Sequence, residues 1–310
     1  MDVVIPFVTC KDEVWMRETM KQTVNPMPIL NHISGQTIRY NLFYDYGTLK
    51  YVLRGIDKYM PYVDNVFLLV SNIEQVPDYI DKSKVRIILH KEFIPEDLLP
   101  IYNSCTIELF LNKIPGLGEE FVYFNDDMIP VKPISYDELF KNGLPCIHFI
   151  NNDRSKTAMT YTHVLFSFYE AKNSVQVKTG HRIDDDNVVV PLHMPTPLIK
   201  SVMDEYSSQE RHQKLIKFYG TRTRNPRNIN QYYWADILYF SGQYVKSDIK
   251  NLYVDMSSLD NIDFSKITDE QFMCVNDVNE KFRSSPLSEL EEIFKQRADK
   301  YFTEKCRYEL

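Results

Sequence analysis

The sequence predicts an α/β protein with a mainly parallel sheet flanked by helices. Short apolar runs rich in β-branched and aromatic residues recur along the first half of the chain, and segments with helical spacing separate them. Strands that alternate with helices form βαβ units, in which the strands lie parallel in one sheet. A chain of 310 residues, 44% of them hydrophobic, is also long enough to bury a large core.

The elements of the first half follow from these patterns. A helix is expected over 45–60, ended by Pro61, and Asn103 is expected to cap a second helix that runs to about residue 113. The face of the first helix is formed by Leu49, Val52, Leu53, Ile56 and Met60. The four runs predicted as strands are 3–8, 63–70, 84–89 and 121–124.

The second half is predicted to be more helical. Helices are expected over 159–171, after Pro226, and at the end of the chain, where Ser285 caps and Pro286 takes the first position. Pro195 and Pro197 are expected to bracket a turn. No linker-like stretch separates the halves 1–145 and 146–310, so residues 1–310 are predicted to form a single domain.

Composition excludes several classes of protein. The net charge of −7 disfavours nonspecific nucleic-acid binding, and no apolar run approaches the ~20 residues that cross a bilayer. The N-terminus lacks the basic region of a signal peptide. The five cysteines are odd in number and form no CxxC pair, which argues against disulfides and thiolate zinc sites and predicts a reducing, cytoplasmic location.

Two acidic motifs are candidates for metal binding. Asn125–Asp127 follows the predicted strand 121–124, and ligands of open α/β sheets bind beyond the carboxyl ends of strands. Paired carboxylates there suit a hard divalent cation, although the same residues are common in plain acidic turns. Asp184–Asp186 is more typical of a solvated loop.

A histidine and an arginine cluster are further candidates. His193 follows an apolar run, and an imidazole at a strand end suits a general base, although a lone histidine is more often structural. Arg222, Arg224 and Arg227 precede a predicted helix, where guanidinium groups suit phosphate oxygens. The alternative is a solvated basic loop.

Several segments together resemble the Stealth family of sugar-1-phosphate transferases, which act in microbial capsule synthesis and to which the animal N-acetylglucosamine-1-phosphotransferase is similar. The second region of the family resembles three segments here: LKYVLRGIDKYMPYVDNVFLLVSN from Leu49, NSCTIEL from Asn103 and IPGLGEEFVYFNDDM from Ile114. The first region of the family resembles MDVVIPFVTCKDEVW at the start of the chain. The third region resembles the His193 and Arg222–Arg224 segments, and the fourth resembles CVND at Cys274. The match runs from residue 2 to residue 309.

The resemblance implies a GT-A-like fold and transfer of a sugar-1-phosphate from a nucleotide sugar, expected to be a UDP-sugar, to a glycan hydroxyl. It implies a Mg²⁺ or Mn²⁺ ion held by Asp126, Asn276 and Asp277, with Asp127 orienting the acceptor or a metal-bound water. His193 would be the base, and Arg222 and Arg224 would hold the phosphates. A lipid-linked acceptor at the inner membrane face is compatible with this. The implied nucleotide-sugar contacts are Asp2, Asp12, Arg54, Asn103 and Asn125.

Some positions depart from the family pattern. Ile5–Phe7 replaces the usual Tyr-Thr-Trp, and Thr48 stands where the family generally has Glu, while Arg39 and Asp45 lie near expected positions. These departures bear on donor selectivity more than on activity. Two other classes of function compete. A GT-A glycosyltransferase would form a glycosidic bond and release UDP, and a glycan-binding module would release no nucleotide.

Overall fold

The computed structural model describes residues 1–23, 44–151, 162–184, 188–225, 227–256, 263–276 and 286–310. Its centre is a five-stranded sheet with the order β10-β4-β1-β2-β3. The strands β1 to β4 run parallel to one another, and β10 lies antiparallel beside β4. The predicted α/β class with a mainly parallel sheet is therefore confirmed. The strands are β1 (Asp2–Pro6), β2 (Asn65–Val70), β3 (Val85–Leu89), β4 (Glu120–Tyr123) and β10 (Thr196–Ile199).

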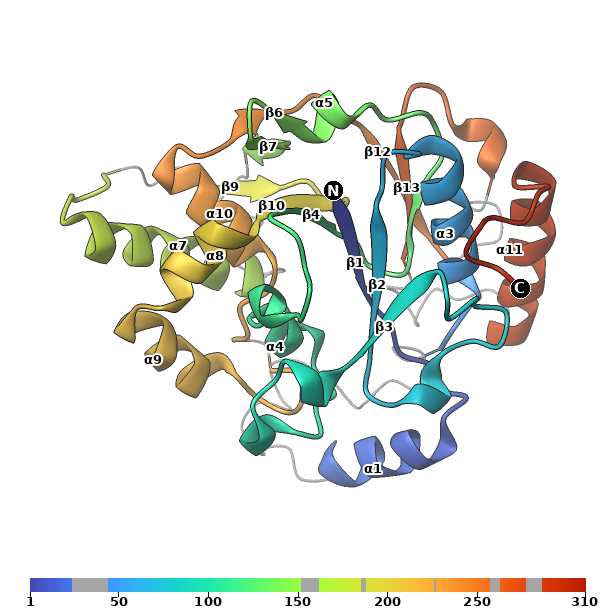
Figure 1. Cartoon of the computed structure of the whole chain (residues 1–310), viewed down its shortest axis with the longest axis horizontal. Coiled ribbons are helices and arrows are strands. Elements are labelled where there is room, and N and C mark those ends of the chain that lie inside the picture. Colours follow the sequence, from blue (N-terminus) through green and yellow to red (C-terminus); the bar gives the residue numbers. More distant parts are fainter. Residues whose placement is uncertain (24–43, 152–161, 185–187, 226, 257–262, 277–285) are drawn as a thin grey trace.

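Helices cover both faces of this sheet, which explains why its strands are apolar without alternation. In β2, for example, every residue from Val66 to Val70 is buried. Figure 1 shows α3 and α11 on one side of the strands, α7 to α10 on the other, and α1 below their carboxyl ends. These helices are α1 (Glu13–Thr23), α3 (Thr48–Tyr59), α7 (Thr162–Thr179), α8 (Lys200–Ser207), α9 (Glu210–Tyr219), α10 (Tyr232–Ser241) and α11 (Leu287–Tyr301).

A second sheet, ordered β12-β13-β5, joins the two halves of the sequence. β12 and β13 are parallel, and β5, which follows the Asn125–Asp127 motif, is antiparallel to β13. α3 packs closely against β5, since a Cβ atom on Gly55 would lie 2.4 Å from the Pro130 carbonyl oxygen. These strands are β5 (Met128–Pro130), β12 (Asn251–Asp255) and β13 (Phe272–Asn276).

Smaller elements complete the fold. Two short sheets are ordered β11-β7-β6 and β8-β9. Their strands are β6 (Phe140–Lys141), β7 (Leu144–Ile147), β8 (Phe149–Asn151), β9 (Val189–Pro191) and β11 (Val245–Lys246). The other α-helices of the described residues are α4 (Ser104–Glu108) and α5 (Tyr136–Leu139). One hydrophobic cluster contains buried side chains from both halves, from Val3 to Tyr308. No helix in the described ranges is both long and apolar enough to cross a bilayer.

Several predicted elements differ from those observed. The turn expected between Pro195 and Pro197 is wrong, because Thr196–Ile199 forms β10, where Pro197 is tolerated since the strand lies at the sheet edge. The helix expected after Pro226 begins only at Tyr232. Pro286 is the N-cap of α11 rather than its first residue, and Ser285 and Pro226 lie outside the described residues. Asn103 does cap α4, as predicted, but that helix ends at Glu108.

Candidate active site

The segments that follow β1, β2 and β4 carry polar side chains at the carboxyl edge of the parallel sheet. Asn125–Asp127 follows β4, and Asp12 follows β1 at the start of α1. Asp12 accepts hydrogen bonds from the Trp15 amide at 2.9 Å and from Asn72, which follows β2, at 2.7 Å. Burial raises the pKa of the Asp12 carboxyl, but these hydrogen bonds outweigh it and lower the pKa overall. Asp12 therefore stays ionised while it ties two loops of this edge together.

Strand β13 brings the Cys274–Asn276 segment beside the acidic motif. Cys274 pairs with Met128, and the Val275 amide donates to the Asp127 carbonyl oxygen at 2.9 Å. The Cys274 thiol also lies 3.7 Å from Asp127 Oδ2. Antiparallel register continues this pairing toward Asn276 and Asp126. Two motifs about 150 residues apart in sequence thus meet at one point, as the family resemblance implies. Asp277 lies outside the described residues.

The two carboxylates of this motif are held in an unfavourable environment. Burial raises the pKa of Asp126 well above its ordinary value, and the charges of Asp127 and Asp45 add to the effect. Burial raises the pKa of Asp127 to about 7. The Oδ1 atom of Asp127 is buried without a hydrogen-bond partner among the described residues. Burial also raises the pKa of Asp45, whose charge acts on Asp126 and whose position sequence reasoning gave only approximately.

Such a cluster fits a divalent cation. An ion beside Asp126 and Asp127 would satisfy the unpartnered Oδ1 atom and offset the repulsion between the carboxylates. Asn276 offers a neutral amide oxygen beside them, and hard cations prefer oxygen donors. Within the described ranges, no group of three or more His, Cys, Asp and Glu side chains is arranged as a ready-made metal site. The carboxylates present therefore supply a partial oxygen donor set.

His193 lies at the same edge. It follows β9 and precedes β10, whose first residue Thr196 pairs with Tyr123 at the carboxyl end of β4. Its Nδ1 atom lies 2.9 Å from the Tyr232 hydroxyl, and its carbonyl oxygen accepts from the Asn251 amide group at 2.7 Å. Burial lowers the pKa of His193 to about 4. The imidazole is therefore neutral at pH 7 with a free lone pair, and the same burial makes it a weaker base than an ordinary imidazole.

The arginine loop is held in place by Asn103. The Asn103 side chain caps α4 and donates to the carbonyl oxygens of Thr221 and Thr223 and to Asn228 Oδ1. On this loop, Arg224 donates to Ser104 Oγ at 2.6 Å and Arg222 donates to the Asp97 carbonyl at 3.1 Å. Both guanidinium groups remain exposed, as does that of Arg227. Asn103 is fully engaged in the protein, so it positions the arginines and does not present its amide to a ligand.

Two residues that the sequence did not single out connect these groups. Burial lowers the pKa of His163, on α7, to about 4, and the nearby charges of Arg224 and His193 add to the effect. Arg224 and His193 therefore both lie close to His163. Glu108 accepts a hydrogen bond from the Tyr123 hydroxyl at 2.9 Å and lies near Arg224. A helical histidine without a motif gives no sequence signal, whereas Glu108 belongs to the quoted NSCTIEL segment.

The structure corrects the expectation for Asp2 and Arg54, which make structural contacts. Asp2 begins β1 at the opposite, amino edge of the sheet, and its two oxygens accept from Asn65 and the Gly118 amide at 2.7 and 2.8 Å. Arg54 donates to both Glu309 oxygens, at 2.7 and 2.9 Å, and to the Phe302 carbonyl. Both side chains are therefore held in hydrogen bonds within the protein, and Asp2 lies at the edge away from the carboxylate motif.

Two other predicted residues are accounted for more simply, and three lie outside the described ranges. Asn125 is half-buried in the turn that leads from β4, where its carbonyl oxygen accepts from the Met128 amide at 3.2 Å. Asp184 is exposed and pairs with Arg182 at 2.6 Å, as the solvated-loop interpretation predicts. Asp185, Asp186 and Arg39 lie outside the described residues.

The fold and the site together define an α/β protein with paired carboxylates, a neutral histidine and arginines at the carboxyl edge of its parallel strands. Residues 42–147 match the Stealth protein conserved region 2. The chain belongs to the Stealth family.

Named relatives agree with this membership. The chain is 30% identical over 236 residues to the capsular polysaccharide phosphotransferase fcs1 of Haemophilus influenzae. The matched region covers 74% of this chain and 62% of that relative. It is 28% identical over 309 residues to the receptor polysaccharide phosphotransferase WefC of Streptococcus oralis, and this match covers 89% of this chain and 90% of that relative. Among solved structures it resembles the galactosyltransferase LgtC in complex with donor and acceptor sugar analogs, with a TM-score of 0.43, 10% identity and 96% of each chain covered.

Proposed function

We propose that this protein transfers a sugar-1-phosphate from a nucleotide sugar, a UDP-sugar, to a hydroxyl of an acceptor glycan in the synthesis of a capsular or other surface polysaccharide. The product is a phosphodiester and the leaving group is UMP. One observation carries the proposal: the Asp126–Asp127 carboxylates, neutral His193 and the arginine loop share one edge of the sheet. The names of the relatives, which are polysaccharide phosphotransferases, support the same reaction class.

The reaction is a substitution at the β-phosphorus of the donor. The acceptor oxygen attacks that phosphorus, the bond between it and the bridging oxygen breaks, and UMP leaves with the electron pair. The acceptor proton passes to His193 Nε2. The C1–O bond of the transferred sugar is not broken, so its anomeric configuration is retained in the product.

The protein's task is to neutralise charge and to align the attack, because the phosphoryl transition state spreads charge over its oxygens. Arg222 and Arg224 are exposed next to this edge and have the planar donor geometry that binds phosphate oxygens. Asp126, with Asn276 and the predicted ligand Asp277, would hold Mg²⁺ or Mn²⁺. When bound, that ion supplies Lewis-acid stabilisation to the diphosphate. Asp127, whose Oδ1 atom has no partner among the described residues, would orient the acceptor hydroxyl or a water molecule bound to that ion.

His193 is the base in this scheme. A base contributes roughly 10²–10⁴-fold to the rate when it is positioned and unprotonated. Tyr232 holds Nδ1, which leaves Nε2 to face the acceptor. The reaction is placed on the cytoplasmic side, where nucleotide sugars are available, with a lipid-linked acceptor presented at the inner face of the membrane.

A product assay separates this function from its competitors. The protein is incubated with UDP-sugars and candidate acceptors in the presence of Mg²⁺ or Mn²⁺, and released nucleotides are separated by ion exchange. Phosphotransfer predicts UMP, while a glycosyltransferase of the GT-A type predicts UDP and a glycan-binding module predicts neither. Release of UDP in equal amount to the product would overturn the proposal.

A further inference from the structure

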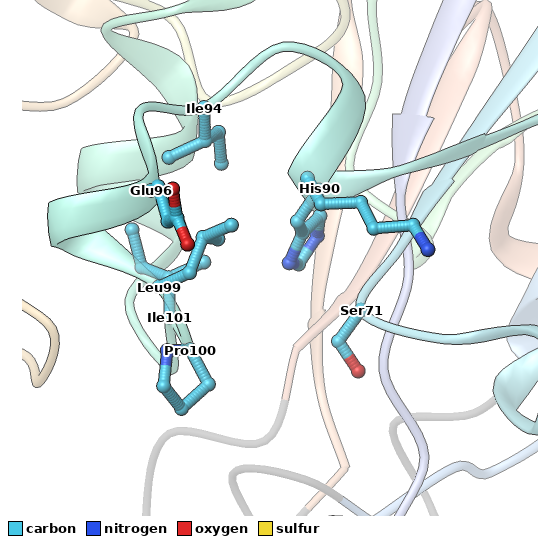
Figure 2. A pocket seen from close by; sticks show the side chains of 8 residues that line it. Ser71, His90, Ile94, Glu96, Leu99, Pro100 and Ile101 are labelled. Carbon is cyan, nitrogen blue, oxygen red and sulfur yellow. The ribbon is translucent and has the colours of Figure 1, made fainter.

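A cavity of about 630 Å³ opens beyond the carboxyl ends of β2 and β3. Figure 2 shows Ser71 and His90, the residues that follow these strands, on one side of an open space and Ile94, Glu96 and Leu99 on the other. We call this cavity the His90 pocket. It is lined by Ser71, His90, Lys91, Ile94, Glu96, Leu99, Pro100 and Ile101.

His90 is the unusual member of this lining. Its side chain is 6% exposed, and neither ring nitrogen has a hydrogen-bond partner among the described residues. Its ring packs edge to face on Phe93, with the centroids 6.2 Å apart. Burial lowers the pKa of His90 to about 4, so at neutral pH the ring offers one donor and one acceptor. Buried polar groups in proteins are normally paired, and a ligand in the pocket would supply the partner.

The remaining lining indicates the shape of that ligand. Ile94, Leu99, Pro100 and Ile101 give the wall opposite the imidazole an apolar part, with Glu96 among them, and Ser71 and Lys91 add further polar groups to the lining. A flat heterocycle has two apolar faces and a polar edge. Its faces match the four apolar side chains, and its edge matches the imidazole and the other polar groups.

The pocket also borders the groups proposed to bind phosphate. Its wall continues into the arginine loop, because the Asp97 carbonyl accepts from Arg222 at 3.1 Å and the Tyr102 amide donates to the Arg222 carbonyl at 2.8 Å. On the opposite side, Asn72 follows Ser71 and donates to Asp12. A nucleotide with its base in the pocket would extend its phosphates toward the arginines and the carboxylate edge.

We propose that the His90 pocket binds the base of the nucleotide donor and that the His90 ring pairs with the polar edge of that base. This inference rests on the proposed function for the identity of the donor. It names residues for base recognition that neither the family resemblance nor the relatives assign.

The test measures binding of mononucleotides to the full chain by calorimetry, without acceptor. UMP, CMP, AMP and GMP are compared with ribose 5-phosphate, which has the phosphate and lacks the base. The wild type is expected to bind UMP at least about tenfold more tightly than ribose 5-phosphate. His90→Phe keeps a ring of similar size without nitrogens and is expected to reduce UMP affinity about tenfold or more, with ribose 5-phosphate unchanged.

A second variant tests whether the volume of the His90 pocket is needed for UMP binding. Leu99→Trp is expected to fill the half-buried rim and to weaken UMP binding, whereas Leu98→Trp, one residue away and outside the lining, is expected to bind UMP as the wild type does. Thermal melting confirms that each variant is folded. The inference is overturned if folded His90→Phe and Leu99→Trp proteins keep the wild-type preference for UMP over ribose 5-phosphate.

The same samples distinguish this inference from the proposed function. Phosphotransfer is judged from the nucleotide that the wild type releases, and base recognition from the binding of UMP alone. Release of UDP with normal UMP binding would reject phosphotransfer and keep the pocket. Release of UMP by His90→Phe with an unchanged KM for the donor would keep phosphotransfer and reject base binding in the His90 pocket.

Discussion

The Nδ1 atom of His193 lies 2.9 Å from the hydroxyl oxygen of Tyr232. Tyr232 is buried on α10, where burial raises the pKa of its phenol far above the ordinary value, so the phenol stays protonated. The hydroxyl oxygen can accept from Nδ1–H, and this is the tautomer that leaves Nε2 free to take a proton. The contact also fixes the direction in which Nε2 points. Tyr232 is therefore a positioning residue for the proposed base.

Loss of that hydroxyl should slow the reaction without weakening donor binding. We expect Tyr232→Phe to lower kcat roughly tenfold to a hundredfold, the effect seen when a group that orients a metal-bound histidine is removed, with KM for the donor unchanged. Tyr253→Phe is the matched control, because its ring also lies beside His193, at 6.0 Å, but is 48% exposed. Steady-state kinetics of both variants decide the point, and equal kcat values for the two would reject the role of Tyr232.

The pH dependence of the reaction tests the environment of His193. Burial holds its pKa at about 4, and a base works only when unprotonated. At saturating Mg²⁺, which keeps the Asp127 carboxyl ionised, we expect kcat/KM to stay level from pH 7 down to about pH 5 and to fall only as the pH approaches 4. A fall centred near pH 6.5, the value of an ordinary imidazole, would contradict this.

Stability must be followed over the same range. Burial also lowers the pKa values of His90, His163 and His212 to about 4. Between pH 6.5 and 4 the unfolded chain therefore binds more protons at these groups than the folded protein, and stability is lost as the pH falls. Circular dichroism at each pH separates unfolding from a true titration of the base.

Asp127 offers a test of the metal site with a readout other than activity. Burial raises its pKa to about 7, so ionisation of this group destabilises the fold as the pH rises from about 4 through 7. Asp127→Asn should stabilise the metal-free protein at pH 8, by on the order of 1 kcal/mol or more, while activity falls at least about a hundredfold. Melting temperatures with and without Mg²⁺ measure this.

The effect of Mg²⁺ on the melting temperature should also differ between the wild type and Asp127→Asn. Mg²⁺ at pH 8 is expected to raise the melting temperature of the wild type and to have less effect on Asp127→Asn, because the ion stabilises only the state that binds it. Asp184→Asn is the control, since Asp184 is exposed and paired with Arg182. An equal Mg²⁺ response in all three proteins would remove Asp127 from the cation site.

The central sheet could be predicted from the sequence because its strands are buried on both faces and therefore read as uninterrupted apolar runs. Strand β10 could not, since it is a short edge strand that contains Pro197. The β5 and β13 strands were also missed, because they have three and five residues and owe their pairing to contacts across about 150 residues. Tertiary contacts, rather than local pattern, form these elements.

The candidate active site also contains residues that the local sequence predicts and residues that only tertiary contacts reveal. Asp126, Asp127 and His193 were predicted from their place after apolar runs, and the structure brings them to one edge. Asp2 and Arg54 belong to the matched motifs, yet their side chains serve the fold. A motif records which residue is required and not whether its partner is a ligand or the protein itself. The buried nitrogens of His90 leave no trace in the sequence, because nothing local marks a missing hydrogen bond.

Asn103 should control the arginine loop from inside the protein. Its side chain accepts from the Cys105 amide as the N-cap of α4 and donates to the Thr221 carbonyl and Asn228 on the loop, so Asn103→Ala removes both the cap and these links. We expect a loss of about 1–2 kcal/mol in the free energy of unfolding and a higher KM for the donor. Asn173→Ala, at an exposed position of α7, is the control. Urea denaturation and kinetics at low temperature check both effects, and a donor KM equal to that of the wild type would refute the link to the loop.

Arg54 and Glu309 provide the last test, because the structure assigns this pair to stability. Two hydrogen bonds of 2.7 and 2.9 Å join α3 to the last residues of the chain, and Arg54 also donates to the Phe302 carbonyl. Removing one partner leaves a buried charge unpaired, so Arg54→Ala should lower the free energy of unfolding by about 3–5 kcal/mol. The hydrogen bonds from Arg54 outweigh burial and lower the pKa of Glu309. The contribution of the ionised Glu309 carboxylate to folding stability is therefore present above about pH 4.5 and is lost as the pH falls further.

The double variant Arg54→Met with Glu309→Leu separates stability from substrate binding. Apolar side chains in place of both charges should restore much of the stability, since no unpaired charge remains. If Arg54 contacted the nucleotide sugar, the restored protein would still show a raised KM for the donor. We expect the KM to match that of the wild type, within about twofold, at a temperature where both proteins are folded.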